Sequence, residues 1–466
     1  MKRLVKNFLS LASSEIVRKI LGFLAVAYLA RRLSLADFGL VSLGFTILAY
    51  TINISTAGLS VFGIKATARG DEKAVVGKLL SLRLLIAGAV FVLSAVGTVL
   101  IVKDPVAARL IVVFSCALFA HALLLDWFYQ GREAMNTVSV GKCVTAAVNL
   151  ILLLVLVRSD LDILLVGAAA VAGDFVMMLF YVVKYRREGN ELHLVADPPA
   201  WRHMLGQSLP LGAGTVLGQI SINLAPLVLA VLMTNVEVGL YSAASKLVMF
   251  LLIIDRVLGI LLLPATARLQ AASPEQLRLR LGEALKWIVL AALPLSVGGM
   301  LLSGDVIRLV FGPNFSEASG VFRILVWFLS LTMIHTVFTS GLLAVAPGDV
   351  YGKVMGRSAV IYFILVVVLT RAYGLFGTAF AVVASEGLTL LIARAKLRPY
   401  LDIRTNIPVL WILVALAAMS VAVLALPSVN IIVRVLTGAG VYCSILLLVR
   451  VLSFNDVATL VWRKSS

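Results

Sequence analysis

The stretch LARRLSLADFGLVS at Leu29–Ser42 returns in altered form 200 residues later, as LAVLMTNVEVGLYS at Leu229–Ser242. Five residues of the first copy are identical to those 200 positions later: Leu29, Ala30, Gly39, Leu40 and Ser42. The positions that keep their chemistry are Ser34 with Thr234 and Asp37 with Glu237. A repeat of this kind is the signature of a duplicated architecture. The sequence therefore predicts two copies of one helical bundle.

The same register continues along the chain. The tetrapeptide ATAR occurs at Ala66–Arg69 and again at Ala265–Arg268, and Asp174 falls opposite Glu386 at an offset of 212. Six helices fit into each copy, and an even number means that both copies enter a membrane from the same side. The repeats are then parallel, related by an axis along the membrane normal. The expected divisions are a bundle over 1–190, a second bundle over 191–400, and two additional helices over 401–466.

Composition places the chain in a membrane. Of its 466 residues 61% are hydrophobic and 14% are charged, with a mean hydropathy of +1.06. Apolar runs of roughly 20 residues, the length that crosses a bilayer, follow one another from end to end. We therefore expect an all-α polytopic protein of about fourteen transmembrane helices. The connections are too short for a soluble catalytic domain, and no nucleotide-binding loop of the Walker type is present.

The charge pattern predicts the orientation. The N-terminus and every second connection after it carry roughly three times as many Lys and Arg residues as the connections on the other side. Both termini are thus expected in the cytoplasm, with the chain in a bacterial inner membrane. The net charge of +17 follows from this bias, so no nucleic-acid partner is needed to explain it.

Charged side chains at membrane depth are costly and tend to face a cavity or a partner. The first predicted helix carries Glu15, Arg18 and Lys19 on one face. In the repeat, Gln219 takes the place of Lys19, and Asn223 extends the same stripe. We interpret this face as lining the space between the halves. An i, i+4 pair of Glu15 with Lys19 near the interface stays open as the alternative.

The eighth predicted helix holds Lys246, Asp255 and Arg256. On one helical wheel the two cations share a side, and the acid lies opposite Lys246. Together with Arg18 and Lys19, these two cations would suit an anionic group such as a phosphate or pyrophosphate.

Acids within the spans are candidates for a coupling H⁺ or Na⁺, since intramembrane carboxylates often relay ions. Those singled out are Glu15, Asp126, Asp174, Asp255 and Glu386. The histidines His121 and His335 are considered with them, although packing is the expected role for each. No metal site or cofactor is expected.

Five patches resemble one family of membrane proteins. They read YLARRLSLADFG, DWFYQGREAM, VGLYSAASKL, LVFGPNF and GLFGTAFAVVASE. The chain is similar to the polysaccharide transporters, the Wzx-like O-antigen and exopolysaccharide flippases, of the multidrug, oligosaccharidyl-lipid and polysaccharide exporter superfamily. One departure is the stretch KATAR at Lys65–Arg69, where members of the family often carry an acid.

The resemblance implies a fourteen-helix flippase that moves an undecaprenyl-diphosphate-linked repeat unit from the cytoplasmic to the periplasmic leaflet, driven by an ion gradient or the membrane potential. It implies anion contacts from the four cations above and sugar contacts from Gln219, Asn223 and Asn53. The implied partners are the lipid-linked oligosaccharide, membrane lipids and other polysaccharide-assembly proteins.

Three other functions stay open. A peptidoglycan-precursor flippase or a multidrug and cation antiporter belongs to the same superfamily, although a cation exporter should have a more acidic cavity. A membrane-embedded polysaccharide polymerase or ligase would handle the same substrate, but it would need a larger external loop. We expect a transporter and not an enzyme.

Overall fold

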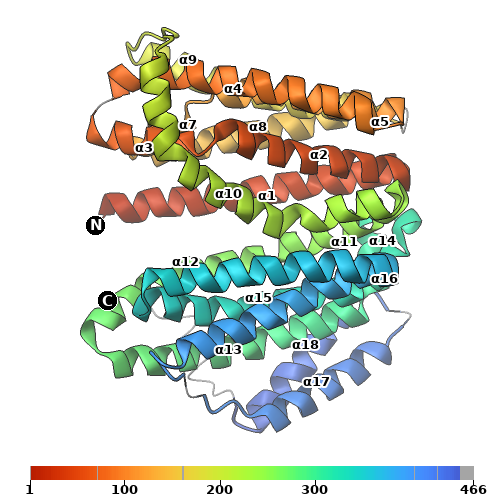
Figure 1. The fold of residues 1–466 in the computed structure, drawn as a ribbon. Helices are drawn as coiled ribbons and strands as arrows, with labels where there is room; N and C mark the ends of the chain where they lie inside the picture. Colours follow the sequence, from red (N-terminus) through yellow and green to blue (C-terminus); the bar gives the residue numbers. More distant parts are fainter. Residues whose placement is uncertain (1, 71, 160–161, 404, 428, 452–466) are drawn as a thin grey trace. The chain divides into compact units, whose positions relative to one another are not determined.

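The computed structural model describes residues 2–70, 72–159, 162–403, 405–427 and 429–451. The regular structure within these ranges is helical (Figure 1). Within these ranges the second ATAR copy, Ala265–Arg268, lies largely outside the described side chains. The prediction of an all-α protein is confirmed. The chain forms two compact units, Met1–Ala243 and Ala244–Ser466, which are described separately below. The boundaries predicted at residues 190 and 400 stay predictions.

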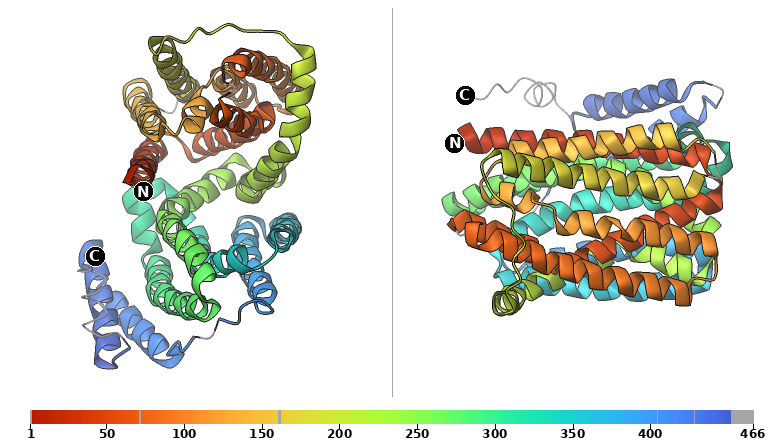
Figure 2. Two further views of the ribbon diagram at one scale, coloured as in Figure 1. Left: turned by 90° about the vertical axis from the view of Figure 1, so that its left-hand side faces the viewer. Right: turned by 90° about the horizontal axis from the view of Figure 1, so that it is seen from above.

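The first unit contains α1 (Lys2–Arg32), α2 (Leu35–Thr56), α3 (Leu59–Arg69), α4 (Glu72–Ile101), α5 (Pro105–Ser115), α6 (Ala117–Ala122), α7 (Asp126–Gly131), α8 (Met135–Leu156), α9 (Ile163–Arg187), α10 (Pro198–Leu232) and the first half of α11 (Asn235–Leu251). The second unit continues with α12 (Ile253–Ala272), α13 (Pro274–Leu301), α14 (Ser303–Phe311), the short 3₁₀ turn η2 (Pro313–Phe315), α15 (Ala318–Val345), α16 (Gly348–Leu397), α17 (Val409–Leu424) and α18 (Ile431–Leu448). Seen along the helices, those of the first unit gather side by side in one bundle (Figure 2).

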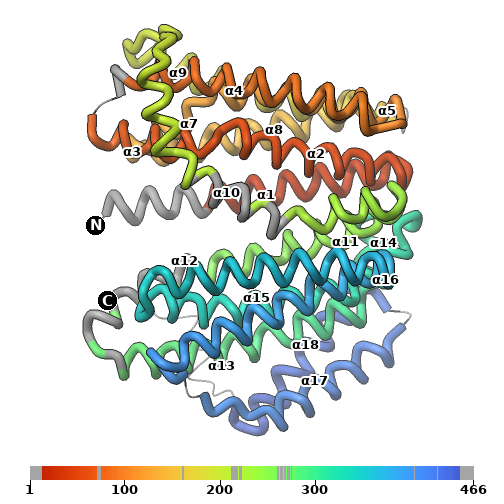
Figure 3. Tube along the Cα trace, viewed as in Figure 1, coloured from red at the N-terminus to blue at the C-terminus, as the bar shows by residue number. Residues whose placement is uncertain are grey.

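Ten helical stretches in the described part are long and apolar enough to cross a membrane. The fourteen predicted passes are consistent with the helices when each interrupted group, α2 with α3, α5 to α7, α11 with α12, and α14 with α15, is taken as one pass. Helix α16 then supplies two passes, since Gly374 leaves the helical conformation with φ 58° and ψ −138°. Its two arms can be followed in Figure 3. Positive φ is the region that glycine enters without steric penalty.

The duplication is visible in how α2 and α11 begin. The Ser34 hydroxyl accepts a hydrogen bond from the backbone N–H of Asp37 at 3.1 Å. At the equivalent place in α11, the Thr234 hydroxyl bonds the Glu237 carboxylate, which also accepts from the backbone N–H of Thr234 at 3.0 Å. Such reciprocal caps satisfy the N–H groups that a helix start leaves unpaired. The two copies share the bond from the hydroxyl to the acid, Ser34 to Asp37 at 2.6 Å and Thr234 to Glu237, and differ in the backbone N–H that is capped.

The paired glycines of the repeat touch each other within the first unit. A Cβ added to Gly39 would lie 1.9 Å from the carbonyl oxygen of Asn235, and one added to Gly239 would lie 2.3 Å from that of Leu35. The contact is reciprocal, because Asn235 stands 200 residues after Leu35 as Gly239 does after Gly39. Small residues allow such close backbone approach in membrane helices. The start of α2 thus crosses the start of α11 at a near-symmetric point.

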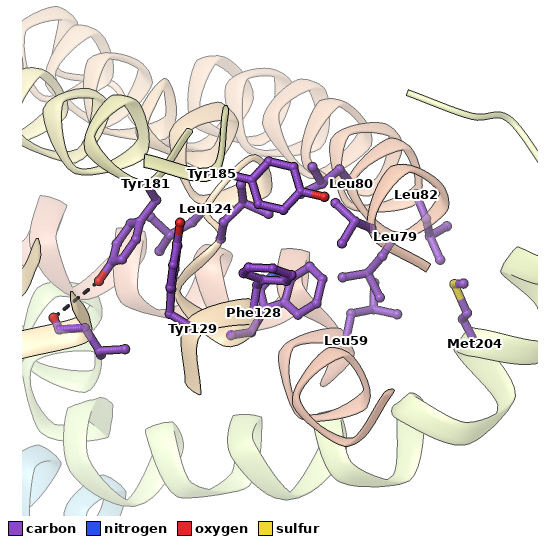
Figure 4. Packing of buried hydrophobic residues seen from close by; sticks show 14 residues of the cluster. Leu59, Leu79, Leu80, Leu82, Leu124, Phe128, Tyr129, Tyr181, Tyr185 and Met204 are labelled. Carbon is purple, nitrogen blue, oxygen red and sulfur yellow. Dashed lines mark hydrogen bonds between the residues drawn. The ribbon is translucent and has the colours of Figure 1, made fainter. Parts of the chain in front are cut away.

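Separate apolar cores hold each unit together. In the first, aromatic and leucine side chains of α3, α4, α7 and α9 interlock around Phe128, whose ring lies edge-on to those of Tyr129 and Tyr185 (Figure 4). In the second, α13 packs on α15, which in turn packs on α16, and α13 also packs on α17 and α18. The two added helices predicted at the C-terminal end are therefore attached through α13.

Candidate functional site

The face of α1 predicted to be polar contains an ion pair between Arg18 and Glu15. Arg18 contacts Glu15 at 2.7 Å between Nη2 and Oε1, so the acid pairs at i, i+3. Arg18 is exposed, whereas Lys19 is half-buried and has interactions of its own. The helix packs against α8, where the Cys143 thiol approaches the carbonyl of Ser14. One of the two predicted anion contacts on this helix therefore already has a carboxylate partner.

The predicted sugar contacts lie on two helices that pack together, α2 and α10. Asn223 donates from Nδ2 to Gln219 Oε1 at 2.6 Å, and the Tyr50 hydroxyl donates to the backbone carbonyl of Gln219 at 3.4 Å. Asn53 donates to the carbonyl of Ala49 in its own helix at 2.8 Å. All three amides are half-buried. The structure brings Gln219 and Asn223 together, and a role in binding sugar stays a prediction.

The charged residues predicted on one helix are distributed over two. Lys246 lies on α11 and is half-buried, whereas Asp255 and the exposed Arg256 follow the interruption at Leu252, on α12. Asp255 accepts a hydrogen bond from the Thr336 hydroxyl of α15 at 2.7 Å. Arg18 and Lys19 belong to the first unit and these residues to the second. The four-cation site is therefore still an expectation from sequence.

Two of the acids proposed for ion coupling are paired with histidine. In the first unit His121 Nε2 lies 3.3 Å from Asp174 Oδ2, and in the second His335 Nδ1 lies 3.0 Å from Glu386 Oε1. The four side chains keep between 14% and 18% of their surface exposed. Packing was the role expected for the histidines. Each histidine lies beside one of the two carboxylates that the repeat aligns, and its role stays a prediction.

Arg83 is a residue that the sequence analysis missed. Helix α4 begins at Glu72 and buries this side chain to 2% exposure. It donates to the carbonyls of His121 at 2.5 Å and Leu124 at 3.2 Å, where α6 stops and α7 has not begun. The His121 carbonyl also accepts from the backbone N–H of Leu124 at 3.4 Å, and the buried guanidinium adds a charged donor where the helix is interrupted.

The signal that would have found Arg83 is its place within an apolar run that starts at Val75. Asp126, the remaining acid proposed for coupling, begins α7 beyond the same interruption. It accepts from the Gln130 amide at 3.0 Å and lies near enough to Arg83 to interact electrostatically. A structural partner therefore exists for this acid. Among the described residues, no three His, Cys, Asp or Glu side chains are grouped as metal ligands.

Known proteins resemble the chain in sequence and in fold. The sequence is 21% identical over 178 residues, 38% of this chain and 38% of the relative, to the probable low-salt glycan biosynthesis flippase Agl15 of Haloferax volcanii. The fold matches the lipid II flippase MurJ with a TM-score of 0.76 at 15% identity, over 94% of this chain and 98% of that one. An inward-facing multidrug resistance MATE family transporter of the MOP superfamily matches with a TM-score of 0.65 at 15% identity, over 82% and 94%.

These relatives are described as flippases and a transporter, not as enzymes. The two structural matches show a shared multi-pass fold. The family of polysaccharide biosynthesis proteins matches residues 4–270, more than half of the sequence. The chain therefore belongs to the polysaccharide biosynthesis protein family.

Proposed function

We propose that the protein is a flippase for a lipid-linked oligosaccharide. It moves an undecaprenyl-diphosphate-linked repeat unit from the cytoplasmic to the periplasmic leaflet of a bacterial inner membrane by alternating access, coupled to an ion gradient or the membrane potential. Both termini lie in the cytoplasm. The proposal depends on one observation: a chain with a duplicated membrane fold belongs to the polysaccharide biosynthesis protein family. Paired bundles with short connections suit transport between two faces of a membrane.

The polar side chains support a substrate with an anionic group and sugars. Arg18 and Arg256 are exposed, and a guanidinium binds phosphate oxygens through paired N–H donors. The amides of Gln219, Asn223 and Asn53 offer donors and acceptors that sugar hydroxyls match. In this proposal the cations hold the diphosphate, and the amides contact the glycan while the lipid tail stays in the bilayer.

A peptidoglycan precursor is the second candidate substrate. Its support is the fold match to the lipid II flippase, which extends over 98% of that protein. At 15% identity the match is one of fold, so the substrate has to be decided by experiment. The two candidates share a lipid diphosphate and differ in the glycan.

Deletion of the gene tests the proposal in cells. We expect the lipid-linked oligosaccharide to accumulate on the cytoplasmic leaflet while its sugars are assembled as before, because only translocation is removed. Export that continues at the normal rate in a strain without a second flippase would contradict the proposal. Accumulation of the peptidoglycan precursor alone would favour the second candidate.

Charge-neutral variants test the anion contacts. Arg18→Gln and Arg256→Gln should each lower export at unchanged membrane abundance, since each removes one phosphate partner. Lys353→Gln is a matched control, because this exposed cation pairs with Asp349 at one end of α16. Equal export by all three variants would place the anion site elsewhere.

A further inference from the structure

The two histidine–carboxylate pairs occupy equivalent places in the two repeats. His335 follows His121 by 214 residues, and Glu386 follows Asp174 by 212, close to the offset that aligns the rest of this region. Each pair joins the helices that occupy matching places, α6 with α9 and α15 with α16, and both contacts are packed. The copies share few identical residues, yet each retains an imidazole beside a carboxylate. The two acids differ in side-chain length, and Glu386 contacts Nδ1 of its histidine whereas Asp174 contacts Nε2. Both pairs nevertheless combine an imidazole with a carboxylate.

Both pairs lie within membrane spans. His121 belongs to the span Pro105–Gly131 and His335 to Ala318–Val345, each in its second half. A lone charge at this depth is costly, and a carboxylate next to a neutral imidazole is such a charge. When the imidazole gains a proton, the pair becomes neutral overall. Protonation therefore changes the stability of the packing between the two helices.

The charged groups around the first pair are few. From α4, Arg83 bonds the carbonyl of His121, and Asp126 stands beyond the interruption before α7. Helices α2, α5 and α8, which pack on α6 or α9, carry one charged residue each, Asp37, Arg109 and Lys142, and α9 carries its own cations in its last turn. Apolar side chains of α2 and α4, among them Ile52 and Leu84, pack against α6.

The second pair has a comparable surrounding. From α12, Asp255 bonds Thr336, next to His335, and Arg256 is exposed. Helix α13 carries Lys286 in its first half. On α15 itself, His335 Nε2 and Thr332 Oγ1 are buried without a hydrogen-bond partner among the described residues. With Nδ1–H donated to Glu386, the second ring nitrogen therefore holds a lone pair that a proton can take.

We propose that His121–Asp174 and His335–Glu386 are proton-binding sites, one in each repeat, through which a proton gradient drives the transport cycle. The inference rests on the proposed function and names its coupling ion. In the step itself, a proton adds to the imidazole lone pair, the imidazolium donates to the carboxylate, and the pair passes from one negative charge to none. Release reverses the step, so no other bond breaks and no electron is transferred.

Imidazole suits this role, because it is the side chain whose charge ordinarily changes between pH 5 and 8. All four side chains keep part of their surface exposed, but Nε2 of His335 is itself buried, so its protonation requires the packed helices to open. A neutral pair favours close packing of its helices, and a charged pair favours their separation and access of water. Proton loss on one side of the membrane and gain on the other would therefore shift each repeat between two arrangements.

The first test detects proton binding without transport. The chain has four histidines, so selectively ¹⁵N-labelled protein in lipid nanodiscs should give four sets of imidazole signals. His193 and His203, both exposed, are internal controls. We expect the signals of His121 and His335 to change with pH, and Asp174→Asn and Glu386→Gln each to alter the response of the histidine that it contacts, because each removes the carboxylate partner. Signals of the paired histidines that stay constant from pH 5 to 8 would overturn the proposal.

The second test measures coupling in vesicles that contain the lipid-linked oligosaccharide. A pH gradient should accelerate flipping by the natural protein, and the double variant His121→Gln/His335→Gln should lose about 5-fold or more of that acceleration, in the range typical of coupled sites. Flipping without a gradient should persist in the variant. Flipping that responds to Na⁺ alone, or a variant with the full pH response, would contradict the inference. Absence of flipping together with histidine signals that behave as described would instead contradict the proposed function.

Discussion

A single methyl group at the crossing of α2 and α11 tests the duplicated architecture. Gly39→Ala would place a Cβ 1.9 Å from the backbone oxygen of Asn235 and 2.9 Å from the backbone N of Gly239, and Gly239→Ala meets the Leu35 oxygen at 2.3 Å. Contacts below 3.0 Å are essentially never made by real Cβ atoms, and these neighbours are backbone atoms that cannot rotate away. The two helices would have to move apart by roughly an ångström.

Overpacking of this kind typically destabilises by about 1–3 kcal/mol, whereas alanine stabilises a helix by at most about 1 kcal/mol over glycine. We therefore expect a net loss on the order of 1–2 kcal/mol for either variant. Gly88→Ala in α4 is the matched control, because nothing lies within 4 Å of its added Cβ. It should be neutral or slightly stabilising.

The measurement is thermal unfolding of the purified variants in one detergent, followed by tryptophan fluorescence. Gly39→Ala and Gly239→Ala should unfold at lower temperatures than the natural protein by similar amounts, since the contact is reciprocal. If Gly39→Ala is as stable as Gly88→Ala, the crossing is not a packed contact and the reasoning fails. A loss confined to one of the two glycines would contradict the near-symmetry.

Three further substitutions have expected outcomes. Arg83→Met should destabilise by about 1–3 kcal/mol in the same assay, because it removes the charged donor from the carbonyls of His121 and Leu124. The exposed Arg158→Met should change stability by less than about 0.5 kcal/mol, and equal effects would refute the buried role. Gly374→Ala should cost about 1–3 kcal/mol through its positive φ, and a neutral result would mean that α16 does not reverse there. The hydrogen bond from Lys78 holds the pKa of Asp197 below its usual range. The stability that this bond provides is therefore present above about pH 4 and is lost as the pH falls further. Asp197→Asn should flatten this part of a pH series of unfolding temperatures, and an unchanged profile would contradict the assignment.

Much of the fold was predictable because the signals are local or repeated. The membrane spans follow from apolar runs, and the hydroxyl and acid at Ser34 and Asp37 predict a helix start wherever the chain goes afterwards. The identity of Gly39 and Gly239 was visible as well. Their contact was not, because it depends on how two distant helices cross.

The site was predictable only in part. Asp174 and Glu386 could be matched by register, but their histidine partners lie on other helices, and sequence spacing does not show which helices pack. Arg83 was missed for a different reason. Its place within an apolar run indicates a helix, but the carbonyls of His121 and Leu124 that it bonds lie about 40 residues away and are revealed only by the structure.

The central claim is that this protein moves a lipid-linked oligosaccharide across a bilayer. The most direct measurement uses vesicles with the purified protein and a labelled undecaprenyl-diphosphate oligosaccharide in both leaflets, followed with an enzyme that cleaves the glycan only from outside. Translocation predicts that cleavage continues beyond the outer-leaflet share until almost all of the substrate is consumed, at a rate proportional to the amount of protein. Cleavage that stops at the outer-leaflet share, as in vesicles without protein, would contradict the account.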